Sequence, residues 1–382
     1  MNIPDDILLM IPGPTNVPPQ VLDALGSPSF YHRGAAFKEL LEVCTEGLKK
    51  VYQTANDVLI LTSSGSGAVE AAIVNVLSPG DKVLVIEGGK FGERMKDIAM
   101  TFGAEVEVLP VEPGRAADPE VVRRLLSDHK ALLFVQNETS TGVRQDADLL
   151  AAAAREVGAL SVVDTVSSMG GMSIPVDEWG LDAVAAGSQK AFMLPPGLAF
   201  VSMSEKAWEA AASARMPRAY FDLVAARKSL AKGQTPWTPN VNMIRALAVS
   251  LELIFAEGLE NVWRRHHALG EACRAAVDAL GLRLFADREH ASDVVTAVHS
   301  PDGLDSKELV SRVRDNHKIL ISGGQGELAG KIFRIGHMGC CQLDDLLRTI
   351  EATAIELNAL GFACAAQEGL AAARAAYQAA MG

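Results

Sequence analysis

Short apolar runs alternate with longer amphipathic stretches between about residues 51 and 203. Each apolar run is followed by a turn or polar segment, and the runs lie at residues 58–61, 83–86, 131–135, 160–163, 183–186 and 198–201. Such runs are typical of buried strands. Two intervening stretches, 67–77 and 146–157, carry apolar residues at helical spacing. The pattern therefore predicts a mostly parallel sheet with helices on both faces.

The strand pattern stops after Met203. A turn-rich segment at 234–240 precedes a long helical run over about 242–280, and we expect the sheet domain to end inside that run. The last third of the chain predicts strands at 282–285, 294–298 and 332–335 and helices at 306–316 and 343–360. These elements indicate a compact second domain of the α+β type. The alanine-rich tail predicts a further helix, to which we assign no role.

The length and composition agree with a folded protein of two domains. The chain has 382 residues, of which 49% are hydrophobic and 21% charged. Its net charge of −12 disfavours nucleic acid and anionic membrane surfaces as partners. Five scattered cysteines without CxxC spacing are typical of reduced thiols. With no apolar run near 18 residues and no basic N-terminal region, the sequence predicts a cytoplasmic protein.

Lys190 is the most informative residue. It follows the apolar run at 183–186 and precedes a rigid Pro195-Pro196-Gly197 turn. Most lysines lie exposed in loops. A lysine at the carboxyl end of a buried strand is, however, partly desolvated, which lowers its pKa and makes its amine a nucleophile.

Asp164 ends another apolar strand. Such an aspartate is often only a helix cap. Together with a strand-end lysine it indicates more, because a buried carboxylate can keep the nitrogen of a pyridine ring protonated. The pair therefore predicts a pyridoxal phosphate site. The segment Ser63-Ser64-Gly65-Ser66-Gly67 leads from a strand into a helix and could hold the phosphate through free N–H groups and the helix dipole. It lacks the third glycine of the dinucleotide motif, which disfavours a nicotinamide enzyme.

Taken in order, these segments resemble the class V, fold type I aminotransferases, in particular the alanine–glyoxylate and serine–glyoxylate (serine–pyruvate) branch. The resemblance covers residues 12 to about 360. Its motifs are Pro12-Gly13-Pro14-Thr15, Ser64-Gly65-Ser66, Asn137-Glu138-Thr139-Ser140-Thr141-Gly142-Val143, Val162-Val163-Asp164, Ser188-Gln189-Lys190 with Pro195-Pro196-Gly197, and Phe333-Arg334-Ile335-Gly336.

The resemblance implies the architecture and assembly. The expected fold is α/β, the fold type I of pyridoxal-phosphate-dependent transferases, with a mostly parallel seven-stranded sheet covered by helices and a smaller C-terminal α+β domain. We expect an N-terminal arm at 1–16, a large cofactor-binding domain at 17–257 and a small domain at 258–382. A homodimer with active sites at the subunit interface is implied as well.

The resemblance also implies the roles of individual residues. Lys190 would carry the cofactor and Asp164 would pair with its ring nitrogen. The other expected cofactor contacts are Ser64, Gly65, Ser66 and Gln189 at the phosphate, Phe91 on the ring face, Thr139 beside the ring, and Thr238 reaching the partner subunit's phosphate. Some relatives have His at position 66 and Tyr at position 235, where this chain has Ser66 and Thr235.

Arg334 is the candidate for the substrate carboxylate. Taken alone it would be interpreted as a surface arginine, and its place in the family motif reverses that interpretation. A planar guanidinium can hold a carboxylate through two parallel hydrogen bonds, which a lysine cannot. By resemblance, Pro12 and Gly13 form the lip of the substrate pocket. No second arginine for a dicarboxylate is identifiable from the sequence.

The predicted function is therefore transfer of an amino group from alanine or serine to a 2-oxo acid such as glyoxylate or pyruvate. Aspartate-specific and aminophosphonate-type aminotransferases remain alternatives. A cysteine desulfurase is less favoured because such enzymes place His directly before the lysine, where this chain has Gln189. A silent binding protein of this fold is disfavoured because Lys190, Asp164 and Arg334 are all retained.

We predict no metal site. His266 and His267 follow Arg264 and Arg265 on a helix, and no further ligand lies at matching spacing. We interpret this basic segment as a solvated helix face.

Overall fold

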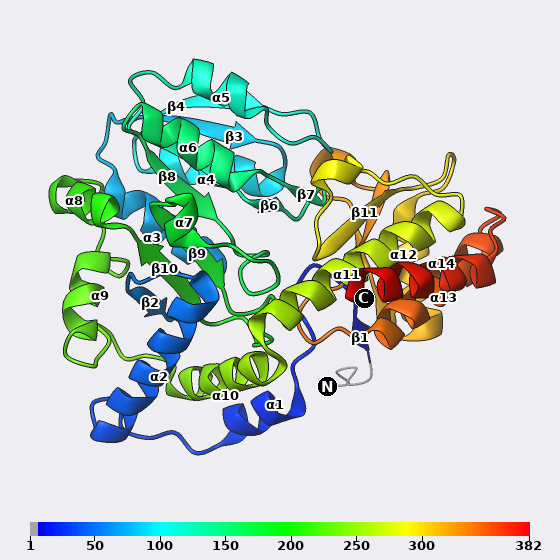
Figure 1. The fold of residues 1–382 in the computed structure, drawn as a ribbon, viewed down its shortest axis with the longest axis horizontal. Helices are drawn as coiled ribbons and strands as arrows, with labels where there is room; N and C mark the ends of the chain where they lie inside the picture. Colours follow the sequence, from blue (N-terminus) through cyan, green and yellow to red (C-terminus); the bar gives the residue numbers. More distant parts are fainter. Residues whose placement is uncertain (1–6) are drawn as a thin grey trace.

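A seven-stranded sheet forms the centre of the computed structural model, which describes residues 7–382. The strand order is β2-β10-β9-β8-β5-β3-β4 (Figure 1), and only β10 runs antiparallel to its neighbours. The strands are β2 (Val58–Leu61), β3 (Lys82–Glu87), β4 (Glu105–Pro110), β5 (Ala131–Val135), β8 (Leu160–Asp164), β9 (Ala183–Gly187) and β10 (Ala199–Met203). The predicted α/β fold with a mostly parallel seven-stranded sheet is confirmed.

Helices cover both faces of this sheet because its strands are buried on both sides. One face packs against α1 (Pro19–Gly26), α2 (Ala35–Tyr52), α5 (Pro119–Leu125), α6 (Ala147–Glu156), α7 (Val176–Trp179) and α10 (Val241–Glu257). The other packs against α3 (Gly65–Val76), α4 (Lys90–Thr101), α8 (Glu205–Ser213) and α9 (Leu223–Leu230). A short hairpin, β6 (Asn137–Glu138) and β7 (Val143–Arg144), follows β5.

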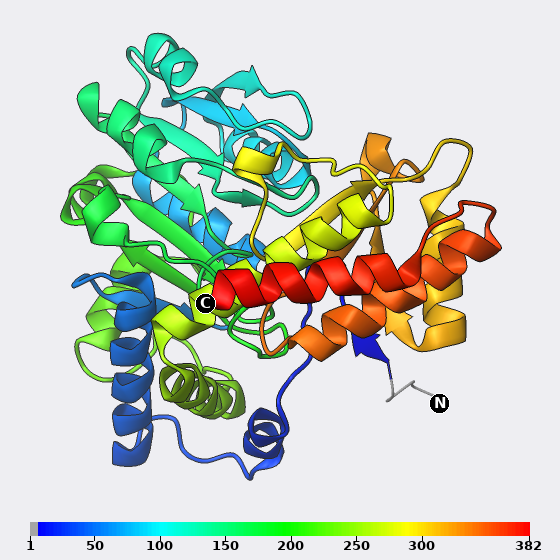
Figure 2. The same cartoon turned by 45° about the vertical axis from the view of Figure 1, so that its right-hand side comes forward.

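The C-terminal part has its own core. An antiparallel sheet of order β11-β14-β13 is built from β11 (Val295–His299), β13 (Ser322–Gly323) and β14 (Ile332–Gly336). The surrounding helices are α11 (Leu259–Ala279), α12 (Ser306–His317), α13 (Leu343–Ala359) and α14 (Ala366–Met381), together with the short 3-10 helices Arg288–His290 and Gly326–Leu328. The alanine-rich α14 lies along α11 (Figure 2). Its small residues allow this close approach.

Three sequence expectations need correction. Residues 282–285 form no strand and contribute only an isolated bridge between Leu284 and Val298. The helical run over 242–280 is broken at Gly258, where the chain has φ = +90° and passes from α10 to α11. Strand β4 was not predicted, because it is a half-exposed edge strand that carries Glu105 and Glu107.

The predicted domain division after residue 257 falls at this Gly258 junction and remains a proposal about folding units. Helix α11 serves both cores: Val262 packs with the large sheet, and Leu269 and Val277 pack in the C-terminal core. Within residues 7–382, every helix is too short or too polar to cross a lipid bilayer.

The N-terminal segment joins the two parts of the molecule. Strand β1 (Leu8–Leu9) pairs with β12 (Ile319–Leu320), and Met10 accepts a hydrogen bond from the N–H of Gly336 at 2.8 Å. A few residues later, the N–H of Thr15 donates to the carbonyl of Gln189 at 3.2 Å. Residues 1–6 of the predicted arm lie outside the described residues.

Candidate active site

Three strand ends bring the predicted chemistry to one edge of the sheet. Strand β8 ends at Asp164, β9 leads to Lys190, and β2 leads into the turn before α3. Because β2 and β9 both pair antiparallel with β10, their carboxyl ends lie on the same side. Loops at this edge of an α/β sheet are where ligands bind.

Lys190 is buried, with 8% of its surface exposed. Its Nζ donates to the carbonyl oxygen of Pro12. Burial lowers the pKa of the amine to about 8, while the carboxylate of Asp164 works in the opposite direction and Arg334 adds to the lowering. Close to neutral pH a useful fraction of the amine is therefore uncharged and nucleophilic.

Gly13 allows the N-terminal segment to pass close to this amine. Its φ is +107°, and a Cβ atom at this position would lie 2.7 Å from Nζ of Lys190. Thr15 fixes the same segment from the other side, because its hydroxyl donates to the carbonyl of Lys190 at 3.1 Å. The structure thus brings Pro12 and Gly13 directly against Lys190.

Asp164 is buried, and its Oδ1 accepts a hydrogen bond from the N–H of Val166 at 2.8 Å. Burial raises the pKa of its carboxyl group to about 6, and the hydrogen bond from Val166 only partly offsets this. The group is therefore ionised at neutral pH. Since no lysine or arginine forms an ion pair with it within residues 7–382, a protonated ring nitrogen would supply a missing partner.

The turn before α3 offers N–H donors for an anion. Ser64 is the residue before the helix, and its hydroxyl does not cap it. The N–H groups of Gly65 and Ser66 form no hydrogen bond within the described part of the chain. Close packing explains the glycine at position 65, because a Cβ there would lie 2.7 Å from Val166.

Gln189 lies beside this turn. Its Oε1 is buried and has no hydrogen-bond partner within residues 7–382. A Cβ on the neighbouring Gly187 would lie 3.2 Å from the Cα of Gly65, so strand β9 and the start of α3 are in close contact. Gln189 therefore lies near the turn that leads into α3, and its role at the phosphate stays a prediction.

Arg94 was missed by the sequence analysis. Its Nη1 donates to the hydroxyl of Ser66 at 3.0 Å, and its guanidinium lies 4.8 Å from the centre of the Phe91 ring. It therefore adds positive charge beside the turn. Since Arg94 covers one face of Phe91, only the other face remains for a cofactor ring. Its spacing of three residues from Phe91 on α4 was the available signal.

Glu138 was quoted within a motif but given no role. It is buried, and its Oε2 accepts hydrogen bonds from the N–H groups of Phe91 and Gly92, both at 3.0 Å. The carboxylate therefore caps α4 and fixes Phe91. Burial raises its pKa, and hydrogen bonds from Ser140 and the α4 backbone oppose this.

Arg334 is 5% exposed and forms no ion pair within residues 7–382. Its Nε and Nη2 donate to the carbonyl of Gly323 at 3.1 and 2.7 Å, and its Nη1 donates to the carbonyl of Thr139 at 2.9 Å. A guanidinium has five N–H donors. Two therefore remain, one on each terminal nitrogen, and both are donors that a carboxylate can use. Burial lowers the pKa of Arg334 to about 10, so the group stays charged.

Thr139 and Thr238 differ in their surroundings. Thr139 is buried, and its backbone is bonded to Arg334. Thr238 is exposed, in a segment that packs beside residues 60–62 and next to Trp237. No bond joins Thr238 to Lys190 or Asp164 among residues 7–382. The role of Thr238 at a partner's phosphate remains a prediction. The hydroxyl of Thr235 donates to the carbonyl of Trp237 in its own turn.

The residues at this edge fit pyridoxal phosphate. They provide a buried lysine, a buried carboxylate that forms no ion pair within residues 7–382, and N–H groups at a helix start that form no hydrogen bond in this part of the chain. The carboxylate and the N–H groups each lack a partner that the cofactor would supply.

Comparison with known proteins agrees with this chemistry. The family model described as Aminotransferase class-V matches residues 7–338. A relative in Synechococcus named soluble hydrogenase, small subunit, is 44% identical over 94% of each chain. The L-aspartate–glyoxylate aminotransferase of Paracoccus denitrificans is 40% identical and covers 97% of this chain and 96% of its own.

A solved structure extends the comparison to the fold. The alanine–glyoxylate aminotransferase of Nostoc sp. superposes with a TM-score of 0.89 at 35% identity, covering 92% of this chain and 95% of that one. The resemblance noted in the sequence is therefore confirmed. The chain belongs to the class-V aminotransferases, enzymes of fold type I that depend on pyridoxal phosphate.

Proposed function

We propose that this aminotransferase takes the amino group of a small neutral L-amino acid, alanine or serine, and passes it to glyoxylate or pyruvate in two half-reactions. The observation that carries the proposal is Arg334, a buried guanidinium with one free N–H on each terminal nitrogen and no carboxylate partner in the described chain. This geometry suits the α-carboxylate that all of these substrates share.

Arg334 would orient the substrate. Its fixed bonds to Gly323 and Thr139 prevent the guanidinium from turning away, so a bound carboxylate has one position. With the carboxylate held, the Cα–H of the substrate can be directed at Nζ of Lys190. Pro12, which accepts from Lys190, and Gly13 would form the wall on the opposite side.

Lys190 and Asp164 would carry the proton chemistry. When bound, pyridoxal phosphate supplies an aldehyde that captures amines and a ring that stabilises negative charge at the substrate Cα. Lys190 would hold the cofactor and, once released by the incoming amine, would move a proton from Cα through its Nζ. Asp164 would hold a proton on the ring nitrogen.

The remaining predicted contacts would position the cofactor. Ser64, Gly65, Ser66 and Gln189 would hold the phosphate, with Arg94 as an additional donor beside Ser66. Phe91 would lie on one ring face, and Thr139 beside the ring.

We further propose a homodimer in which Thr238 reaches the partner's phosphate. Tyr220 and Trp237 support this proposal, because they form an exposed stack with ring centres 5.9 Å apart and each is 47% exposed. Tyr31, 68% exposed, lies in a neighbouring segment that is linked by the hydrogen bond from Arg33 to Gln234. Exposed aromatic groups on adjoining segments are typical of interfaces.

A second candidate donor is aspartate. The Paracoccus relative is named for it, and Arg94 is a second guanidinium whose charge acts on Lys190. If Arg94 contacts the phosphate, it is not available to a substrate side chain. If it is free to contact the substrate, a dicarboxylate would be preferred.

The lyase alternative has less support. A desulfurase needs a reactive thiolate, whereas burial raises the pKa of the thiols of Cys340 and Cys341, the cysteines that follow the Arg334 strand.

A half-reaction screen tests the proposal. Cofactor-loaded protein is mixed with alanine, serine or aspartate, and the absorbance of the bound cofactor is followed as it takes up the amino group. We expect alanine or serine to react at least tenfold faster than aspartate, since one missing charge contact weakens binding by about that factor. Lys190→Ala should not react, and Lys130→Ala, at an exposed lysine, should behave as the wild type.

The variant Arg94→Gln distinguishes the two candidate classes of amino donor, alanine or serine on one hand and aspartate on the other. For an alanine or serine enzyme it should weaken the cofactor and leave the relative reactivity of the amino acids unchanged. A selective loss with aspartate would instead make aspartate the donor. Failure of all three amino acids would reject the proposed donor class.

A further inference from the structure

A cavity of about 340 Å³ lies between the large sheet and α11, and Lys190 does not line it. Gln136 and Arg144 line it from the β5–β7 side, and Trp263, Arg264 and His267 line it from α11. Its volume is within the range of cavities that bind small organic molecules. None of its lining residues belongs to the candidate active site.

Three buried polar atoms of this cavity lack partners within the described residues. Gln136 is 2% exposed, and its side-chain oxygen forms no hydrogen bond within residues 7–382. Two buried donors, Nε of Arg144 and Nε1 of Trp263, are also without a partner in this part of the chain. A buried polar group without a partner costs about 1–3 kcal/mol in general. Three such groups at one cavity indicate that a ligand completes them.

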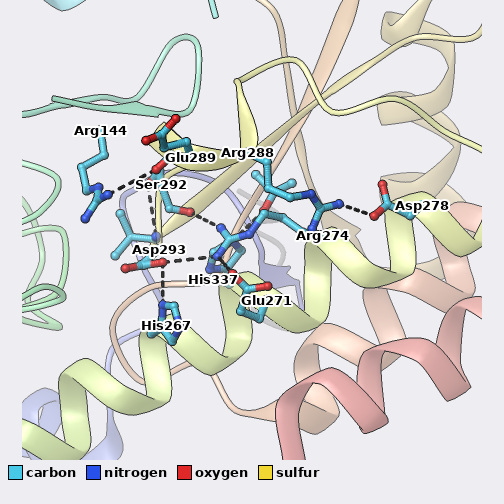
Figure 3. Close-up of polar contacts among 12 residues, drawn as sticks. Arg144, His267, Glu271, Arg274, Asp278, Arg288, Glu289, Ser292, Asp293 and His337 are labelled. Carbon is cyan, nitrogen blue, oxygen red and sulfur yellow. Dashed lines mark hydrogen bonds and ion pairs between the residues drawn. The ribbon is translucent and has the colours of Figure 1, made fainter. Parts of the chain in front are cut away.

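The charge at the cavity favours an anion. Neither Arg144 nor Arg264 forms an ion pair within the described chain. The one acidic lining residue, Asp293, already bonds His267 at 3.1 Å and Arg274 at 3.3 Å, and Arg274 also bonds Glu271 at 2.6 Å. Figure 3 shows Arg144 on one side of Asp293 and Arg274 on the other, with His267 below Asp293. Nη2 of Arg144 donates to the carbonyl of Glu289 and Nη2 of Arg264 to Oδ1 of Asn261, both at 3.3 Å, so within the described residues these two guanidinium groups have neutral partners only.

The basic segment of α11 divides between two environments, which corrects the expectation of a solvated face. Arg265 and His266 are buried, where Arg265 bonds Glu257 at 2.7 Å and His266 accepts from the N–H of Gly339 at 3.0 Å. Arg264 and His267 are exposed and belong to the cavity. The helix thus presents one cationic edge to this cavity.

We propose that this cavity binds a small organic carboxylate with a flat apolar body. Arg144 and Arg264 would hold the carboxylate, with Nε1 of Trp263 as a further donor. The rings of Trp179 and Trp263, with the side chain of Met172, would contact the apolar body. The Oε1 of Gln136 would accept a hydrogen bond from an N–H or O–H group on that body.

A single residue, Gln136, would separate a ligand in this cavity from Asp164 of the candidate active site. The N–H of Gln136 donates to the carbonyl of Asp164 at 2.9 Å. Arg144 pairs in the β6–β7 hairpin with Asn137, and the same hairpin leads to Thr139, which holds Arg334. The two sites therefore share the hairpin. Arg144 lines the cavity, whereas Thr139 belongs to the candidate active site.

The probe for the test is 4-fluorobenzoate, with cofactor-loaded full-length protein. Fluorine relaxation of the probe reports binding without any readout of turnover. We expect saturable binding to the wild type and to Arg334→Ala, since the second variant removes the carboxylate contact of the active site. The neutral analogue 4-fluorobenzamide should bind about tenfold more weakly because it lacks the charge.

Variants of the cavity complete the test. Arg264→Gln should weaken 4-fluorobenzoate about tenfold, and the exposed Arg124→Gln should not. Gln136→Met keeps the volume but removes the unpartnered amide oxygen, so it should raise the melting temperature, and binding of 4-fluorobenzoate, which has no donor for that oxygen, should stay as in the wild type. Absence of binding at millimolar probe, loss of binding in Arg334→Ala, or wild-type binding in Arg264→Gln would each overturn the proposal.

Discussion

At the scale of single residues, burial determines the properties of the candidate active site. Lys190, Asp164 and Arg334 are all charged side chains with less than a tenth of their surface exposed. Burial shifts the pKa of each toward its neutral form, to about 8, 6 and 10. Among residues 7–382 none of the three forms an ion pair, which leaves them available to a cofactor and a substrate.

The pKa of Lys190 predicts how cofactor capture depends on pH. The uncharged amine is the nucleophile, so capture by cofactor-free protein should accelerate about tenfold per pH unit below 8 and level off above it. A solvated lysine would keep accelerating toward the ordinary lysine pKa of 10.5. Stopped-flow absorbance checks this. Asp164→Asn should move the midpoint to lower pH, because the Asp164 charge raises the pKa of Lys190; a rate still rising at pH 10 would contradict the assignment.

Arg334→Lys tests whether the two available N–H groups of Arg334 bind the substrate carboxylate. An ammonium group cannot present two parallel N–H bonds, so KM for the amino donor should rise about 10- to 100-fold, with a smaller change in kcat. The measurement is steady-state kinetics with alanine and glyoxylate. Arg283→Lys, at an exposed arginine, is the control. An unchanged KM would remove Arg334 from substrate binding.

Sequence reasoning found the residues whose signal is local. Lys190 and Asp164 each directly follow or end an apolar run, and the structure places both where the strands end. Arg94 and Glu138 were missed because their roles depend on contacts across the chain, to Ser66 and to the start of α4. The spacing of Arg94 from Phe91 indicates only their mutual contact, and no spacing shows the contact of Arg94 with Ser66 or of Glu138 with α4.

At the scale of elements, the start of α3 depends on a close approach between backbones. Gly65 lies against Val166 on one side and against Gly187, the last residue of β9, on the other, so both glycine positions require a residue without a side chain. The strands themselves were predictable because their apolar runs are buried on both faces. Strand β4 and the short strands β1, β12 and β13 were not, since they are half-exposed or only two residues long.

Gly65→Ala should disturb this turn. The new Cβ would lie 2.7 Å from Val166, and relieving that contact should cost about 1–3 kcal/mol in stability and weaken cofactor binding about tenfold. Thermal unfolding and cofactor titration measure the two effects. Val166→Ala should restore both in the double variant. Gly26→Ala, where nothing lies within 4 Å, is the matched control, and a wild-type cofactor affinity for Gly65→Ala would exclude this turn from cofactor binding.

At the scale of the whole molecule, the proposed dimer is the feature that a single chain leaves open. Tyr220 and Trp237 are exposed aromatic residues with no covering in the described chain. The sequence indicated the segment through its family resemblance, but the stacking of Tyr220 on Trp237 joins residues 17 positions apart and was visible only in the structure.

Trp237→Glu should separate the subunits. A charge in an apolar interface is costly to bury, so sedimentation should change from twice 40.5 kDa to the single-chain mass, and cofactor affinity should fall as Thr238 is withdrawn. Ile355→Glu changes a residue that is also 47% exposed, on α13, and should leave both properties intact. A wild-type protein that sediments as an active monomer would refute the dimer.

The segment at residues 8–15 has a mechanical consequence. It is anchored to the C-terminal part through β12 and Gly336, and to the large sheet through the Thr15–Gln189 bond, while Pro12 and Gly13 lie against Lys190 between these anchors. Any rotation of the C-terminal part relative to the large sheet must therefore displace residues 8–15. The shape of the space around Nζ of Lys190 therefore depends on the relative orientation of the two parts of the molecule. A rotation of either part would move Pro12 and Gly13 relative to that amine.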